Sequence, residues 1–195
     1  PIEDAQTRDG RQAQLVEIPR RAGMITTRWF AVVNTMFTPI PRTTAAQAYR
    51  SYLGFDLARL EGLYDVPGEP MDYDRKGVDQ PECARCHATL DPLSYPFSRY
   101  AGFGGGIPFS YAPNRLDRLS EGPQDTLRDT PEAGALFGQP VADLLEWSQV
   151  AANSDAFAQA LVRDYWRLFM GEAPRPTEQE EFDALWRGFK NDSYA

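Results

Sequence analysis

The chain has 195 residues, of which 42% are hydrophobic, 12% aromatic and 25% charged. This composition is typical of a globular protein with a substantial core, and it excludes a chain that is disordered throughout. No apolar run approaches the ~20 residues of a membrane helix, so the sequence predicts no transmembrane segment. The formal net charge of −8 argues against nucleic acid as a partner, because nucleic-acid binding requires a basic surface.

An N-terminal arm and two helices are expected before residue 54. The polar residues 1–19 form the arm, and apolar residues that recur near the helical period predict a helix over 20–37. Pro39 and Pro41 then exclude a regular helix and predict a loop. A second helix is expected over 45–53, with a threonine cap at its start and a glycine after its end. The residues expected at these ends are Thr43 or Thr44, and Gly54.

The middle of the chain is expected to be irregular. A stretch rich in proline, glycine and aspartate predicts a loop up to residue 81. A short helix over 82–88 follows, and Asp91-Pro92 is expected to end it. Residues 100–140 contain several glycines and prolines and few β-branched residues, so neither a long helix nor an extensive sheet is expected there. A short hairpin is expected around Gly134.

Three amphipathic helices are predicted in the last third. They cover 141–152, 155–170 and the segment from a capping box at 177–180 to about Phe189. Ser154 is expected to cap the second helix and Gly171 to end it. The aromatic residues of these helices are expected to face the core. We therefore expect one region over 20–135, with a C-terminal helical region over 136–195 packed on it as one compact unit.

Both cysteines and the only histidine of the chain lie within five residues, Cys83-Ala84-Arg85-Cys86-His87. The pattern C-x-x-C-H is typical of covalent haem c attachment. On a turn of helix the two thiols lie on one side, where each can add to a vinyl group of the porphyrin. The next residue, His87, can then bind the iron axially. The sequence thus predicts one covalent haem c bound by Cys83, Cys86 and His87, so that 20–135 is the haem-c-binding region.

Three other chemistries can use a C-x-x-C or Cys–His pattern. A structural zinc site needs four ligands, and here Asp91 would have to be an atypical fourth. A thioredoxin-like C-x-x-C needs a βαβ context, which the flanks do not suggest. A disulfide would leave the adjacent histidine unexplained.

The sixth iron ligand is expected to be a methionine, since no second histidine exists. Met36 is preferred because it precedes a loop stiffened by two prolines, so His87 and Met36 are the predicted metal ligands. Met24 is the next candidate, and Met71, Met170 or an open site remain alternatives.

Groups around the haem can be predicted as well. The second ring nitrogen of His87 is expected to donate to a backbone carbonyl in the segment 91–93. Three arginines are candidates for pairing with the haem propionates. These are Arg28, Arg42 and Arg99.

Residues beyond the haem motif carry a family resemblance. They are Arg21, Ala22, Gly23, Met24, Ile25, Cys83, Cys86, His87, Asp91, Pro92, Phe97, Tyr100 and Gly102. With the segment CARCHATLDPLSYPFSRYAG, the chain resembles the paired C-terminal, cytochrome-c-like domains of unknown function in large exported bacterial proteins. The tail from Leu136 to Phe189 is similar to the second domain of that pair. The resemblance implies export and haem c, but no substrate.

The sequence therefore predicts a mostly α protein, a cytochrome-c-like helical domain with long irregular loops around one covalent haem. The favoured function is electron transfer by a monohaem c-type cytochrome rather than an enzyme, within a larger exported redox assembly. Redox proteins or other subunits are the expected partners, on the periplasmic or outer-surface side of a bacterial envelope. The alternatives are a peroxidase-like haem enzyme with an open distal site, and a structural or interaction module whose fold the haem stabilises.

Overall fold

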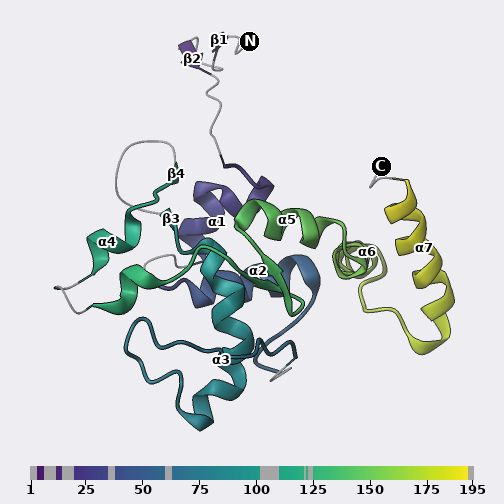
Figure 1. Ribbon diagram of the computed structural model, residues 1–195. Coiled ribbons are helices and arrows are strands. Elements are labelled where there is room, and N and C mark those ends of the chain that lie inside the picture. Colours follow the sequence, from purple (N-terminus) through teal and green to yellow (C-terminus); the bar gives the residue numbers. More distant parts are fainter. Residues whose placement is uncertain are drawn as a thin grey trace.

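The computed structural model describes residues 4–6, 12–14, 20–34, 38–59, 63–101, 110–120, 122 and 125–192. Within them the chain is mostly helical, and its strands form only two-stranded antiparallel pairs (Figure 1). The predicted mostly α class is confirmed. In the described part of the chain, no helix is long and apolar enough to cross a membrane.

The N-terminal segment is divided differently from the prediction. In the arm, β1 (Asp4–Gln6) pairs with β2 (Gln12–Gln14). The helix expected over 20–37 is wrong in its extent, because a 3₁₀ turn η1 (Gly23–Thr26) and a separate short helix α1 (Arg28–Val33) replace it. The break lies at Thr27, whose backbone is extended and whose hydroxyl accepts from Phe30 N and so caps α1. Three of the apolar residues on which the helix prediction depended are exposed: Met24, Trp29 and Val33.

Helix α2 (Arg42–Leu53) starts three residues earlier than expected. Pro41 stands at its N-terminal boundary, which suits a residue without a backbone N–H, and the predicted threonine caps are wrong. Thr44 instead lies inside the helix and donates its hydroxyl to Asn34 O. The predicted end is confirmed, since Gly54 adopts a left-handed conformation with φ of 74°.

Helix α3 (Pro81–Ser94) is twice the predicted length, because Asp91-Pro92 does not end it. A proline inside a helix leaves the carbonyl four residues earlier without its usual donor. Here that carbonyl, Ala88 O, accepts from Val66 N in the preceding loop at 3.1 Å. The helix therefore continues past the proline and runs into a 3₁₀ turn, η2 (Tyr95–Phe97).

Short elements fill the region between residues 100 and 141. The hairpin expected around Gly134 is present, and Gly134 itself lies so close to α3 that a Cβ there would come within 2.1 Å of Pro92 O. A short helix, α4, was not predicted. The glycine run at 104–106 lies outside the described residues. The elements are β3 (Tyr100–Ala101) with β4 (Ser110–Tyr111), α4 (Arg115–Leu119), η3 (Thr126–Asp129), and β5 (Gly134–Leu136) with β6 (Gln139–Val141).

The last three helices are close to the prediction. Helix α5 (Leu144–Ala152) begins at the side-chain cap Asp143, three residues after the expected start. Helix α6 (Asp155–Met170) has the predicted boundaries, with Ser154 as cap and Gly171 as the left-handed end. After a 3₁₀ turn, η4 (Pro176–Glu178), helix α7 (Gln179–Asn191) closes the fold. The capping box at 177–180 is wrong, because Arg175 N donates to the Glu178 carboxylate instead.

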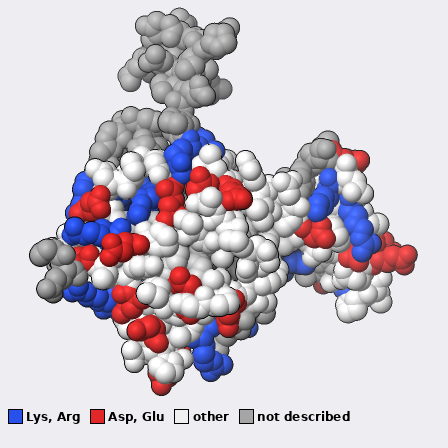
Figure 2. All heavy atoms as spheres, viewed as in Figure 1, with Lys and Arg blue, Asp and Glu red and all other residues white. Residues whose placement is uncertain are grey.

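The main core lies where α2, α3, α5 and β5 meet, around Tyr49, Phe97 and Trp147. Helix α6 packs on α2, whereas α7 packs on α6 through a separate small cluster centred on Phe182 and Trp186. The α6–α7 pair consequently projects from the main body (Figures 1 and 2). Aromatic residues of α6 expected in the core are exposed there, including Phe169 at 78%.

Candidate functional site

The cysteine–histidine motif occupies the first two turns of α3. Cys83, Cys86 and His87 stand at positions i, i+3 and i+4 of this helix, which places them on one face. Cys83 is exposed, Cys86 is partly buried, and both are free thiols. The two sulfurs are thus accessible on the same side of the helix as the imidazole.

The His87 imidazole is held by a carboxylate from the same helix. Its Nδ1 lies 2.7 Å from Oδ1 of Asp91, one turn further along α3. An ionised carboxylate can only accept, so Nδ1 is the donor in this bond, and Nε2 is the ring nitrogen left for a metal. The prediction of a backbone carbonyl as acceptor is wrong, although it named the correct segment. Because α3 continues through residue 94, the side chain rather than the backbone of Asp91 meets the ring.

Asp91 belongs to a buried chain of charges that consists of Asp91, Arg42 and Asp74. Both its oxygens are bonded to Arg42, from Nε and Nη2 at 2.7 Å each, and its side chain is 0% exposed. Arg42 in turn binds both oxygens of Asp74 at 2.6 and 3.0 Å, and the Asp74 side chain is 4% exposed. Arg42 is therefore paired with two carboxylates of this chain, and its pairing with a haem propionate stays a prediction.

Burial and hydrogen bonding act in opposite directions on the pKa values of Asp91 and Arg42. Burial alone would raise the pKa of Asp91, but hydrogen bonds from Arg42 and His87 outweigh it and hold the pKa below its ordinary value. Burial would likewise lower the pKa of Arg42, and its bonds to Asp91 and Asp74 raise it instead. Asp91 thus stays ionised and remains an acceptor for His87.

The loop before α3 supplies Asp74 and is fastened along the helix. Asp65 accepts from the Thr89 hydroxyl, and Glu69 accepts from the Tyr95 hydroxyl at 2.6 Å. Within the loop, the Asp72 carboxylate accepts from the backbone N–H groups of residues 76 and 77. These bonds form the turn that directs Asp74 toward Arg42.

A second buried arginine fixes the segment that follows Met36. Arg115 donates to Thr38 O, Pro39 O and Ser98 O at 2.7 to 2.9 Å. Desolvation lowers the pKa of its guanidinium to about 10. The proline-containing loop is therefore anchored by side-chain bonds as well as stiffened by its prolines, which sequence reasoning did not identify.

The remaining predicted site residues are not brought to His87 by the described contacts. Met36 and the side chain of Arg28 lie outside the described residues. Arg99 donates to Thr130 O, and its Nη1 is buried without a partner in the part of the chain that the structure describes. The other three methionines are at least half exposed: Met24, Met71 and Met170.

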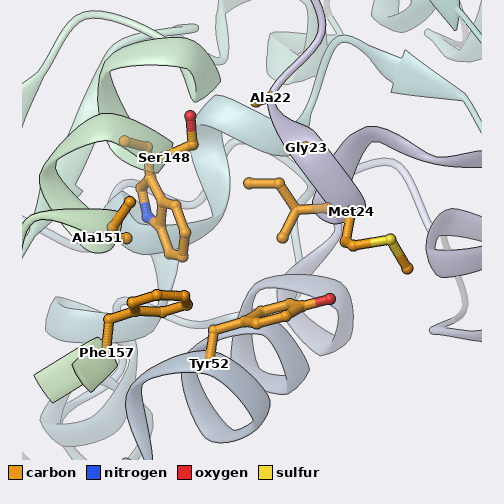
Figure 3. Close-up of a pocket in the computed structure, with 10 residues that line it drawn as sticks. Ala22, Gly23, Met24, Tyr52, Ser148, Ala151 and Phe157 are labelled. Carbon is orange, nitrogen blue, oxygen red and sulfur yellow. The ribbon is translucent and has the colours of Figure 1, made fainter. Parts of the chain in front are cut away.

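An apolar cavity of about 300 Å³ lies apart from the motif. Ile25, Tyr52, Trp147 and Phe157 are among the residues that line it, and none of the three motif residues does (Figure 3). Met24 also lines this cavity, with its side chain directed away from the Phe157 ring. The cavity is therefore formed by η1, α2, α5 and α6 and not by the face of α3 that carries the motif.

The arrangement at the motif suits haem better than the alternatives. Among the described residues no three His, Cys, Asp or Glu side chains are placed to hold a metal ion, and Asp91 is fully engaged by Arg42 and His87. A covalent haem needs two accessible thiols and an imidazole with one free nitrogen, and α3 presents these on one face. The residues present fit the predicted cofactor.

Acidic and basic side chains are mixed over the visible surface. Figure 2 shows Asp and Glu beside Lys and Arg across the main body, with no extended basic face in this view. Several of these charges form ion pairs, such as Arg50 with Asp56.

Comparison of the chain with known proteins leaves the family open. No protein-family model, no curated protein and no solved structure matches it. The resemblance in sequence to exported cytochrome-c-like domains therefore stays an expectation.

Proposed function

We propose that this protein is a monohaem c-type cytochrome that transfers electrons. The observation that carries the proposal is the single face of α3 that presents Cys83, Cys86 and His87, with Nδ1 of His87 bonded to Asp91. The two thiols would anchor the haem through thioether bonds, and Nε2 of His87 would be its axial ligand. The helical body with its long loops around α3 is in keeping with a cytochrome-c-like fold.

A bound haem c would supply a one-electron couple at iron. The chain's own residues would hold and orient the cofactor: Cys83 and Cys86 by covalent bonds, and His87 through a ring whose rotation Asp91 restricts. Met36 is the proposed sixth ligand, because the segment that follows it is stiffened by Pro39 and anchored by Arg115. A methionine at that position raises the reduction potential.

The proposed setting is a larger redox assembly outside the cytoplasm, on the periplasmic or outer-surface side of a bacterial envelope. Haem c is attached on that side of the bacterial inner membrane, and the resemblance of the sequence points the same way. The proposed partners are redox proteins or other subunits of the assembly.

A peroxidase-like enzyme is the second candidate, and one observation favours it. The bond from His87 to the Asp91 carboxylate would make the imidazole a stronger donor to a bound iron, and such hydrogen bonding to a metal-bound histidine tunes reactivity. This candidate requires an open sixth position, whereas electron transfer does not.

Optical spectroscopy during a redox titration separates the two candidates. For an electron carrier we expect one reversible one-electron transition, a low-spin spectrum, and no binding of cyanide by the native protein. Met36→Ala should free the sixth position, lower the reduction potential and allow cyanide to bind, while Met24→Ala should leave the spectrum unchanged. A native ferric protein that is high-spin, binds cyanide rapidly and consumes peroxide would instead establish the enzyme. A change in Met24→Ala alone would move the sixth ligand to Met24.

A further inference from the structure

The chain of charges behind His87 has a geometry that a simple helix anchor does not require. An ion pair between α2 and α3 would need only Arg42 and Asp91. Here Oδ1 of Asp91 also receives His87 Nδ1 at 2.7 Å, and Asp74 neutralises Arg42 from its other side. The carboxylate is thus shared between the arginine and the imidazole.

We infer that Asp91 is a positioning residue that sets the reduction potential of the iron bound at His87, and that Arg42 and Asp74 control how strongly it does so. The inference rests on the proposed haem function and deepens it. A hydrogen bond from the ring to a carboxylate places negative charge on the imidazole and makes it a better donor to ferric iron. The Asp91 side chain is 0% exposed, so water does not screen this effect.

Arg42 and Asp74 act on the ring in opposite directions. Arg42 withdraws electron density from Asp91 through two charge-assisted bonds and so weakens Asp91 as an acceptor for His87. Asp74 competes for the same guanidinium and restores part of that strength. The formal charges of Asp74, Arg42 and Asp91 sum to −1, and Lys76 balances this charge from the solvent side, with its Nζ 3.7 Å from Asp74 Oδ2. It is therefore the hydrogen bond from His87 to the Asp91 carboxylate, and not a net charge, that favours the ferric state of an iron bound at His87. The chain of charges formed by Asp74, Arg42 and Asp91 therefore opposes the rise in reduction potential that a methionine ligand would cause.

The test compares aspartate-to-asparagine variants in the holoprotein. In Asp91→Asn the ring loses its anionic acceptor, so we expect a more positive midpoint potential and a lower iron–histidine stretching frequency. Removing a hydrogen bond to a charged partner changes an equilibrium by about tenfold. The ferric-to-ferrous ratio at a fixed ambient potential should therefore fall by about that factor. Asp74→Asn should also raise the midpoint potential and lower the iron–histidine stretching frequency, each by a smaller amount than Asp91→Asn.

Asp65→Asn is the matched control. Asp65 is exposed, accepts from the Thr89 hydroxyl of α3, and makes no described hydrogen bond to Asp91, Arg42 or Asp74. The same charge change at Asp65 should therefore leave the midpoint potential and the stretching frequency as in the native protein. If Asp91→Asn carries haem and keeps the native potential and stretching frequency, Asp91 is only a structural anchor and the inference is wrong. If that variant does not fold, an unshifted Asp74→Asn decides the question in the same way. Failure of the native protein to attach haem would instead contradict the proposed function.

Discussion

Replacing Arg42 with leucine should lower the free energy of unfolding by about 3–5 kcal/mol, since breaking a buried ion pair leaves an uncompensated buried charge. Two carboxylates depend on this guanidinium, Asp91 at 0% exposure and Asp74 at 4%. Leucine preserves some of the apolar packing of the arginine stem but supplies no donor. Urea unfolding of the holoprotein, followed by circular dichroism, measures the loss.

The matched control is Arg50→Leu on the same helix. Arg50 pairs with Asp56 at 3.0 Å, but its side chain is about half exposed, and such surface pairs contribute at most about 1 kcal/mol. We therefore expect a small effect at Arg50 and a large one at Arg42. Equal losses at the two positions would show that burial does not strengthen the dependence on Arg42.

Gly134→Ala should be the second strongly destabilising change, at about 3 kcal/mol. A Cβ at this position would lie 2.1 Å from Pro92 O and 2.6 Å from Cδ of Pro96. These atoms belong to a backbone carbonyl and a proline ring, neither of which can rotate away, so β5 and α3 would have to separate. The same urea titration measures the loss.

Gly188→Ala is the control for the glycine substitution itself. Gly188 lies in α7, and a Cβ there would meet no atom within 4 Å. Alanine is a better helix former than glycine by about 1 kcal/mol, so this variant should be equal to the native protein or more stable. A Gly134→Ala protein as stable as the native one would mean that β5 does not pack as closely on α3 as described.

Elements bounded by local signals could be predicted from the sequence. The boundaries of α6 follow from Ser154, which accepts from Phe157 N, and from Gly171, whose left-handed conformation ends the helix. Gly54 ends α2 for the same reason. In each case the deciding interaction lies within a few residues of the boundary, so no knowledge of the tertiary fold is needed.

Elements decided by distant contacts were predicted poorly. Pro92 indicated a helix end, but Val66 N compensates the missing bond at Ala88 O, and the helix continues. The apolar pattern around Met24 and Trp29 suggested a buried helix face, yet both residues are exposed. Periodicity cannot show which apolar residues the rest of the chain covers.

The candidate site divides in the same way. Cys83, Cys86 and His87 are predictable because their chemistry is encoded in one short motif. The i, i+4 spacing of His87 and Asp91 was a usable signal, and it was missed because the helix was expected to end at Asp91. Arg42 could not be assigned to Asp91, because the two residues are 49 positions apart and no local pattern links them.

The most direct test of the central claim is the mass of the denatured protein, purified from a host that attaches haem c in its periplasm. We expect the chain to be heavier than its sequence by one haem, to retain its colour in acid acetone, and to lose both properties in the Cys83→Ser/Cys86→Ser double variant. An unmodified chain mass, or haem that acid acetone extracts completely, would contradict covalent attachment at Cys83 and Cys86.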